Sequence, residues 1–236
     1  MPLATAWAEV ERAVAETARF PPGALSFVDW AAVERGELAV SRGAVTVAVG
    51  RVRAPRTAVW LAMTHDTPAA RLRGLVERAL VGRWGASTKR LYQRIDLPWP
   101  VQDRHWVIES RTNLALSARA PSAWERAWTT VPAALSGTRD ADPDPAAWDA
   151  AAAVPRNDGA WLLVDAGPDA TLAVYRVAVD LGGAVPTAAV SGWTARSLEE
   201  VYRTLESDAR ALASHGEAGC TTQPGGDGRP IPCGPR

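Results

Sequence analysis

Acid–base chemistry near neutral pH depends first on histidine, and the sequence has three, His65, His105 and His215. A nucleophilic triad also needs a serine or cysteine beside one of them and a carboxylate that orients the imidazole. The sequence contains no Gly-x-Ser-x-Gly elbow. We therefore expect no catalytic residue, and we interpret His105 as a surface polar residue beside Trp106.

Two other short motifs are explained better by structure than by catalysis. Asp103-Arg104 follows a Pro-Trp-Pro turn, where an ion pair and an arginine fork bonded to backbone oxygens would hold the turn in place. Gly182-Gly183 fits neither the GxGxxG nor the Walker spacing. It is typical of a turn that needs the conformational freedom of glycine ahead of a helix.

The sequence indicates neither a metal nor a cofactor. Four aspartates lie between positions 140 and 149, but they lack the central glycine and the distal glutamate of an EF-hand loop. Cys220 and Cys233 have no zinc-site spacing and no suitably spaced histidines. They are equally compatible with a disulfide and with two free thiols. We therefore expect no metal and no cofactor.

Charge and hydropathy limit the classes of partner. The 236 residues carry 26 basic and 26 acidic side chains, which gives no electrostatic footprint for nucleic acid. No apolar run is long enough for a membrane-spanning helix, and the first residues do not resemble a signal peptide. We expect a cytoplasmic protein, or a periplasmic or secreted one if a signal peptide has been removed. Any contact with a membrane should be transient.

The elements that position these residues follow from hydrophobic periodicity. The first part of the chain predicts a helix over 4–19, short strands over 25–30, 37–40 and 44–49, a helix from Pro55, and a second helix over 67–83. The rest predicts strands over 89–96, 106–112 and 129–131, an irregular insertion with a short helix over 136–152, a hairpin of 161–165 with 171–180, and a final amphipathic helix from Thr187 or Thr194 to Ser214. This order favours one α+β domain with an antiparallel sheet over 1–215, and a Gly/Pro-rich disordered tail over 216–236.

Strand alternation separates two faces of the segment 106–112. Trp106, Ile108, Ser110 and Thr112 share one face, and charged or polar residues such as Arg111 share the other. This pattern predicts a half-solvated antiparallel strand. In the later strand, the alternation likewise puts Tyr175 and Val177 on one face, opposite Arg176.

The sequence contains three distinctive segments: the Pro-Trp-Pro-Val-x-Asp-Arg-x-aromatic turn from Pro98 to Trp106, Gly159-Ala160-Trp161, and Asp180-x-Gly-Gly-x-x-Pro186. Together these segments resemble the START family, the lipid-transfer domains related to the steroidogenic acute regulatory protein. The resemblance spans about residues 25–212, although 117–154 match little. It implies a helix-grip fold, in which a curved antiparallel sheet wraps around a long C-terminal helix with an interior cavity. It also implies a soluble, monomeric protein of bacterial type that binds and transfers a hydrophobic small molecule.

The resemblance places a lipid or sterol-like ligand between the sheet and the last helix. Inward-facing apolar and hydroxyl-bearing side chains are then the expected ligand contacts: Trp106, Ile108, Ser110, Thr112, Tyr175, Val177, Trp193, Val201, Tyr202 and Leu205. From periodicity alone, a filled core fits these residues equally well. Some family members have an arginine at the position of Ser110, and Arg111 should face the other way. We therefore expect a ligand head group to meet hydroxyls rather than a guanidinium.

Two alternative functions remain open. Helix-grip proteins include polyketide aromatase/cyclases, and in such an enzyme His105, Tyr175 or Tyr202 would act as acid–base groups. The absence of clustered histidines and carboxylates argues against this alternative. A sensor or scaffold whose filled core binds nothing is the second alternative.

Overall fold

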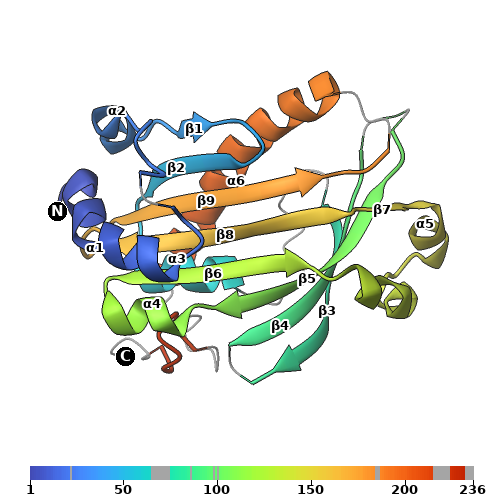
Figure 1. Cartoon of the computed structure of the whole chain (residues 1–236). Helices are drawn as coiled ribbons and strands as arrows, with labels where there is room; N and C mark the ends of the chain where they lie inside the picture. The colour runs from blue at the N-terminus through green and yellow to red at the C-terminus, as the bar shows by residue number, and fades with distance from the viewer. Residues whose placement is uncertain are drawn as a thin grey trace.

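One sheet frames the molecule (Figure 1). The computed structural model describes residues 1–21, 23–64, 75–85, 87–97, 99, 101–183, 187–214 and 224–231, with the side chains of 75–78 and 187–196 outside the description. In that part of the chain the strands are β1 (Ala39–Ser41), β2 (Thr46–Val52), β3 (Leu75–Trp84), β4 (Thr88–Ile95), β5 (Arg104–Thr112), β6 (Ala123–Thr130), β7 (Ala152–Ala153), β8 (Arg156–Asp165) and β9 (Thr171–Asp180).

The strand order is β1-β2-β9-β8-β6-β5-β4-β3, and every neighbouring pair along it is antiparallel. The short strand β7 pairs in parallel with the start of β5. The predicted α+β fold with an antiparallel sheet is therefore confirmed. Strands β2 and β9 are adjacent although more than a hundred residues separate them in the sequence, so strands from the two ends of the chain belong to one sheet.

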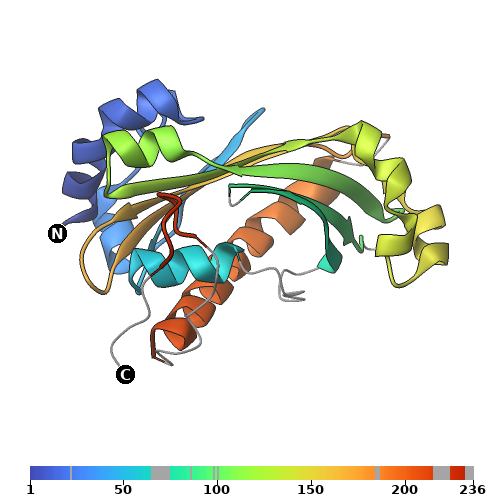
Figure 2. The same cartoon turned by 90° about the horizontal axis from the view of Figure 1, so that it is seen from below.

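Helices cover both faces of this curved sheet (Figure 2). Helices α3 and α6 lie against one face, which we call the inner face, and α1 and α4 lie against the opposite, outer face. Each layer has its own apolar core, with Val10 and Leu172 in the outer one and Trp60 and Leu163 in the inner one. The helices are α1 (Leu3–Thr17), α2 (Trp30–Arg35), α3 (Arg56–Thr64), α4 (Leu114–Arg119), the 3₁₀ helices η1 (Pro132–Gly137) and η2 (Arg139–Ala141), α5 (Pro145–Ala150) and α6 (Thr187–Ser214).

Two predicted elements are wrong. Residues 25–30 form a turn and the start of α2 instead of a strand, because the Asp29 carboxylate caps the N–H groups of Ala31 and Ala32. Gly36 then ends this helix with a φ of 99°, a left-handed conformation that suits glycine.

The second error concerns the helix predicted over 67–83. Residues 75–84 form strand β3, and the remainder of that prediction lies outside the described residues. The helical periodicity of these residues predicts backbone hydrogen bonds within a helix. In the structure, the backbone of β3 pairs with the antiparallel strand β4 instead.

The predicted disordered tail contains a folded segment, residues 224–231. Trp60 Nε1 donates a hydrogen bond of 3.1 Å to the Pro224 carbonyl oxygen, and Ile231 is buried in the inner core. A Cβ at Gly226 would lie 2.3 Å from Trp124 Cγ, so only glycine permits this approach. The glycine content that favours disorder therefore allows this segment to pack closely against Trp124. The rest of 216–236 lies outside the described residues.

Candidate functional site

Cross-strand register brings most of the predicted ligand contacts to the inner face. Ser110 of β5 lies opposite Trp128 of β6, Trp128 lies opposite Gly159 of β8, and Gly159 lies opposite Val177 of β9. Directly opposed residues of antiparallel strands point to the same side of the sheet. Tyr175, two residues before Val177, shares that side.

Aromatic rings from four elements form a continuous wall on this face. The Trp161 ring of β8 lies 4.7 Å from the Tyr175 ring of β9 and 5.3 Å from the Tyr202 ring of α6, measured between centroids. On its other side Tyr175 meets the Trp128 ring of β6 at 5.8 Å. We call these four residues the aromatic wall. Its tilted ring pairs are geometries in which aromatic side chains attract one another beyond their burial.

Tyr202 fastens helix α6 to the sheet. Its hydroxyl lies 2.8 Å from the Ala48 carbonyl oxygen of β2 and 3.0 Å from that of Ala173 in β9, and it can donate to either. Its ring lies against Gly50, where a Cβ would be only 2.7 Å from the ring atom Cε1. Burial raises the pKa of Tyr202, so the hydroxyl keeps its proton and remains a donor.

The remaining predicted contacts lie in two apolar clusters. Trp106 and Ile108 are buried in a cluster at the β4–β5 end of the sheet, where Trp106 Nε1 donates to Gln93 Oε1 at 3.0 Å. Leu205 is buried in the cluster under α6, and Val201 is half-buried on the same helix. Trp128 packs against the first cluster and contacts Tyr175, which packs against the second, so the aromatic wall links the two clusters. The side chain of Trp193 lies outside the description.

A buried arginine that the sequence analysis missed also lies on the inner face. Arg126 of β6 donates from Nε to Ser110 Oγ at 2.7 Å and from Nη1 to Thr112 Oγ1 at 3.2 Å. A guanidinium therefore lies beside the hydroxyls that we expect to meet a ligand head group. Alternation along Trp124, Arg126 and Trp128 would have shown one inward face, but the predicted strand covered only 129–131.

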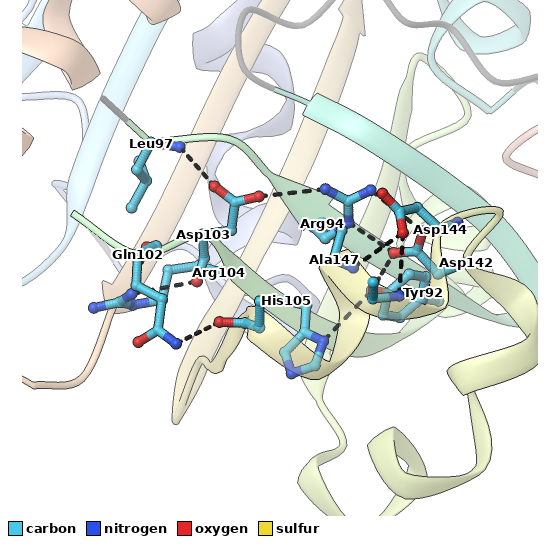
Figure 3. Close-up of polar contacts among 12 residues, drawn as sticks. Tyr92, Arg94, Leu97, Gln102, Asp103, Arg104, His105, Asp142, Asp144 and Ala147 are labelled. Atoms are coloured by element: carbon cyan, nitrogen blue, oxygen red, sulfur yellow. Dashed lines mark hydrogen bonds and ion pairs between the residues drawn. The ribbon is translucent and has the colours of Figure 1, made fainter. Parts of the chain in front are cut away.

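On the outer face, a polar network joins the sheet to the segment between η2 and α5 (Figure 3). The carboxylate of Asp142 accepts from Arg94 Nε at 2.7 Å, from Arg94 Nη2 at 3.2 Å and from the Tyr92 hydroxyl at 2.9 Å. The guanidinium of Arg94 and the neighbouring donors hold the pKa of Asp142 below its usual value, against the effect of burial. The network thus anchors the predicted irregular insertion to β4.

His105 belongs to this network, and its prediction as a surface residue is wrong. It is 4% exposed, with its ring 5.0 Å from the Trp148 ring of α5 and its Nδ1 3.4 Å from the Tyr92 hydroxyl oxygen (Figure 3). Helix α5 covers it, which strand alternation cannot reveal. Burial, with Arg94 nearby, lowers the pKa of His105, so the imidazole is held neutral.

The Asp103-Arg104 motif holds the turn, as predicted, although the two side chains bond elsewhere rather than to each other. Asp103 Oδ2 accepts from Arg94 Nη1 at 3.3 Å, and Oδ1 accepts from the Leu97 N–H at 3.4 Å. Arg104 Nε donates to the Leu181 carbonyl oxygen at 2.8 Å, which ties the turn to the residues just before α6. Gly182 and Gly183 have φ values of 68° and 67°, which confirms the prediction of a turn that needs glycine.

Two wider properties of the described residues bear on function. None of the helices in that part of the chain is both long and apolar enough to cross a bilayer. Within the same residues, no three histidine, cysteine or acidic side chains gather in an arrangement suited to a metal ion.

Comparison with known proteins identifies the fold. The sequence matches no family model and no curated protein. Among solved structures, human STARD10 aligns over 86% of this chain and 85% of its own, with a TM-score of 0.55 and 12% identity. Human StAR-related lipid transfer protein 5 covers 89% of this chain and 98% of its own, with a TM-score of 0.53 and 15% identity. The aromatase/cyclase Zhui from Streptomyces sp. R1128 covers 71% and 94%, with a TM-score of 0.51 and 12% identity. The chain has the START-like, helix-grip fold.

Proposed function

We propose that this chain binds one hydrophobic small molecule, a lipid or sterol-like compound, between the inner face and α6, and carries it without chemical change. The aromatic wall is the observation that carries the proposal. Trp128, Trp161 and Tyr175 give the sheet a large apolar surface at the position where α6 crosses it. Apolar and aromatic walls with a few placed polar groups are the usual lining of small-molecule sites.

The mechanism of such a carrier is the transfer of apolar area out of water. Enclosing a few hundred Å² at about 25 cal/mol per Å² gives several kcal/mol of gross free energy, enough to hold a ligand before ordering costs are subtracted. This chain shares its fold with human StAR-related lipid transfer protein 5, which supports a carrier. It shares the same fold with the aromatase/cyclase Zhui, so the fold alone does not distinguish a carrier from an enzyme.

The position of the acid–base groups favours binding over catalysis. His105 lies on the outer face beneath α5, away from the aromatic wall. The Tyr202 hydroxyl bonds backbone carbonyls of the sheet, and burial raises the pKa of Tyr175. The sheet therefore separates His105 from the two tyrosines, so an imidazole and these hydroxyls cannot act together on one reacting atom.

Native mass spectrometry of protein purified without detergent tests the proposal, followed by solvent extraction of any adduct. We expect a stoichiometric apolar adduct, either as purified or after incubation with a lipid extract of the expression host. A clean apo mass in both cases would refute the carrier function.

A matched pair of variants locates the ligand. Trp161→Leu removes the centre of the aromatic wall and should lower adduct occupancy several-fold, because a buried aromatic surface is lost from the site. Trp148→Leu alters a tryptophan on α5, whose ring meets His105 on the outer face, and should leave occupancy unchanged. An equal loss of adduct occupancy in both variants would mean that the ligand does not lie along the aromatic wall.

A further inference from the structure

Residues 224–231 follow α6 in the sequence and form a compact turn beside α3 (Figure 2). The Gly225 N–H donates to the Arg229 carbonyl oxygen at 2.7 Å, and the Gly228 N–H donates to the Gly225 carbonyl oxygen at 3.0 Å. An antiparallel bridge joins the two prolines of the segment. We call residues 224–231 the C-terminal turn. Its prolines and internal hydrogen bonds restrict the backbone, so it packs as one small unit.

The C-terminal turn covers the indole of Trp124, on β6. A Cβ at Gly225 would lie 2.9 Å from Trp124 Cη2, and a Cβ at Gly226 would lie 2.3 Å from Trp124 Cγ, so the backbone of the turn runs along the indole. The Trp60 ring of α3 meets the same indole in a T-shaped pair, with 5.5 Å between centroids. Arg56 Cζ lies over it, 4.1 Å from the centroid. Helix α3 and the C-terminal turn therefore enclose Trp124 together.

Trp124 lies on the inner face, next to the aromatic wall. It precedes Trp128 by four residues on β6, and its partner across the β6–β8 register, Leu163, follows Trp161 by two residues. Side chains at such even spacings share one face of a sheet, and two residues span about 7 Å along a strand. Ile231 of the C-terminal turn is buried in the apolar cluster under α6, against which the rings of the wall on β8 and β9 pack. The C-terminal turn therefore covers the inner face just beyond the aromatic wall.

We propose that the C-terminal turn limits the length of the hydrophobic tail that the inner face accepts. The inference rests on the proposed function and adds the size of the ligand. A tail that lies along the aromatic wall toward Trp124 ends against α3 and the C-terminal turn. Each methylene moved from water into the site raises the affinity about fourfold, whereas a methylene beyond this end either stays in water or has to displace the turn. The affinity therefore stops rising at one tail length.

The experiment uses straight-chain alcohols with even numbers of carbons, from hexanol to octadecanol, which share one head group and differ only in length. Their affinities for the full chain are measured by competition against a fluorescent apolar probe. We expect the affinity to rise from one alcohol to the next and then to stop rising at one chain length, which we call the breakpoint. A rise through the whole series would overturn the inference, because nothing would then limit the tail.

Two variants that displace the C-terminal turn assign the breakpoint to it. Gly226→Leu places a side chain where Trp124 lies, and Ile231→Asp puts a carboxylate into the apolar cluster under α6. Both should speed hydrogen exchange in 224–231 and move the breakpoint to a longer alcohol, while the shorter alcohols bind as before. Gly137→Leu is the matched control, because a Cβ at Gly137 meets nothing within 4 Å. It should keep the breakpoint of the unaltered chain.

The possible outcomes separate this inference from the proposed function. If the unaltered chain shows no breakpoint, or binds only the fluorescent probe, the length limit is overturned while the carrier function stands. If neither the probe nor any alcohol binds, the carrier function fails as well. These comparisons need no variant, so a folding defect in a variant does not affect them.

The variants give the remaining outcomes. A breakpoint that stays the same in Gly226→Leu and Ile231→Asp would mean that another part of the site ends the tail. Unchanged hydrogen exchange in both would mean that these contacts do not hold the C-terminal turn in place, as a limit to the tail requires. An equal shift in Gly137→Leu would assign the breakpoint to a general loosening of the chain. Each of these three results overturns the inference.

Discussion

At the scale of single residues, the Tyr202 hydroxyl is the clearest polar bond between α6 and the sheet. Replacing Tyr202 with Phe removes a buried donor and leaves the Ala48 and Ala173 carbonyl oxygens without it. We expect the free energy of unfolding to fall by about 1–2 kcal/mol, measured by chemical denaturation. Ligand occupancy should be nearly unchanged in a carrier, whereas a cyclase that uses this hydroxyl would lose its activity. An unchanged unfolding free energy would show that the hydroxyl does not hold α6.

The buried His105 predicts a pH dependence of stability. Its pKa in the folded protein is lowered below the ordinary 6.5, so the unfolded chain takes up a proton more readily than the folded one. Stability is therefore fully present above pH 6.5 and decreases as the pH falls from there toward the folded pKa. Asp142, whose pKa is also lowered, contributes a separate loss that begins only near its usual 3.8.

Replacing His105 with Gln removes the loss of stability that begins below pH 6.5. We expect the unfolding free energy of the variant to vary less than that of the unaltered chain between about pH 7 and pH 5. Denaturant titrations at a series of pH values measure this difference. Parallel profiles for the two proteins would mean that His105 does not set the acid response.

At the scale of elements, one buried ion pair joins the insertion between β6 and β8 to strand β4. The Asp142 carboxylate is fully buried, and Arg94 beside it is 7% exposed. Asp142→Asn keeps the shape but leaves the Arg94 charge without its main partner, which should cost about 3–5 kcal/mol of unfolding free energy. Hydrogen exchange should accelerate first in η2 and α5, whose attachment to β4 passes through this residue.

Asp149→Asn provides the matched control for that prediction. Asp149 pairs with Arg139 in the same insertion, but both side chains are about half exposed, at 52% and 48%. Exposed pairs contribute little, so stability and exchange in α5 should stay as they are. Equal effects of the two substitutions would mean that the insertion is not anchored through Asp142.

Local patterns predicted those elements whose residues carry their own signal. The alternation in 171–180 and the amphipathic spacing of 187–214 reappear as β9 and α6. Strands β4 and β5 pair on either side of the predicted Pro-Trp-Pro turn, of which Pro98 and Pro100 lie outside the described residues. Strand β3 was mistaken for a helix because its partner, β4, determines its conformation. Helix α2 was missed although Asp29 and Gly36 are a good capping pair, so that error was avoidable.

The candidate site was predicted in part for the same reason. The alternation of side chains along β5 identified Ser110 and Thr112 as inward-facing. Arg126 was not identified, because the prediction for its strand, β6, covered only the last residues of that strand. The environment of His105 depends on Trp148, which lies more than forty residues away in the sequence and is positioned by tertiary packing. A single sequence contains no local pattern for that contact.

At the scale of the whole molecule, α6 is held at several points that a carrier must release. Tyr202 bonds the sheet near the middle of the helix, and Glu206 accepts the backbone N–H of Arg53 at 2.9 Å. Before the helix begins, Arg104 donates to the Leu181 carbonyl oxygen. A ligand enclosed between the inner face and α6 leaves only if the helix or the loops against it shift, as lids do in other enclosed sites.

A disulfide across one of these points tests whether α6 is the gate. Arg53→Cys with Glu206→Cys, in a background with Cys220 and Cys233 replaced by Ser, would fasten the helix to the end of β2. We expect ligand exchange to slow at least tenfold when the disulfide forms and to recover on reduction. The rate is measured as the transfer of a fluorescent lipid between vesicles. The reduced protein is the control, since it differs only in that bond. Undiminished exchange in the oxidised form would refute a gate at α6, because the ligand would then pass while the helix stays fastened to the sheet.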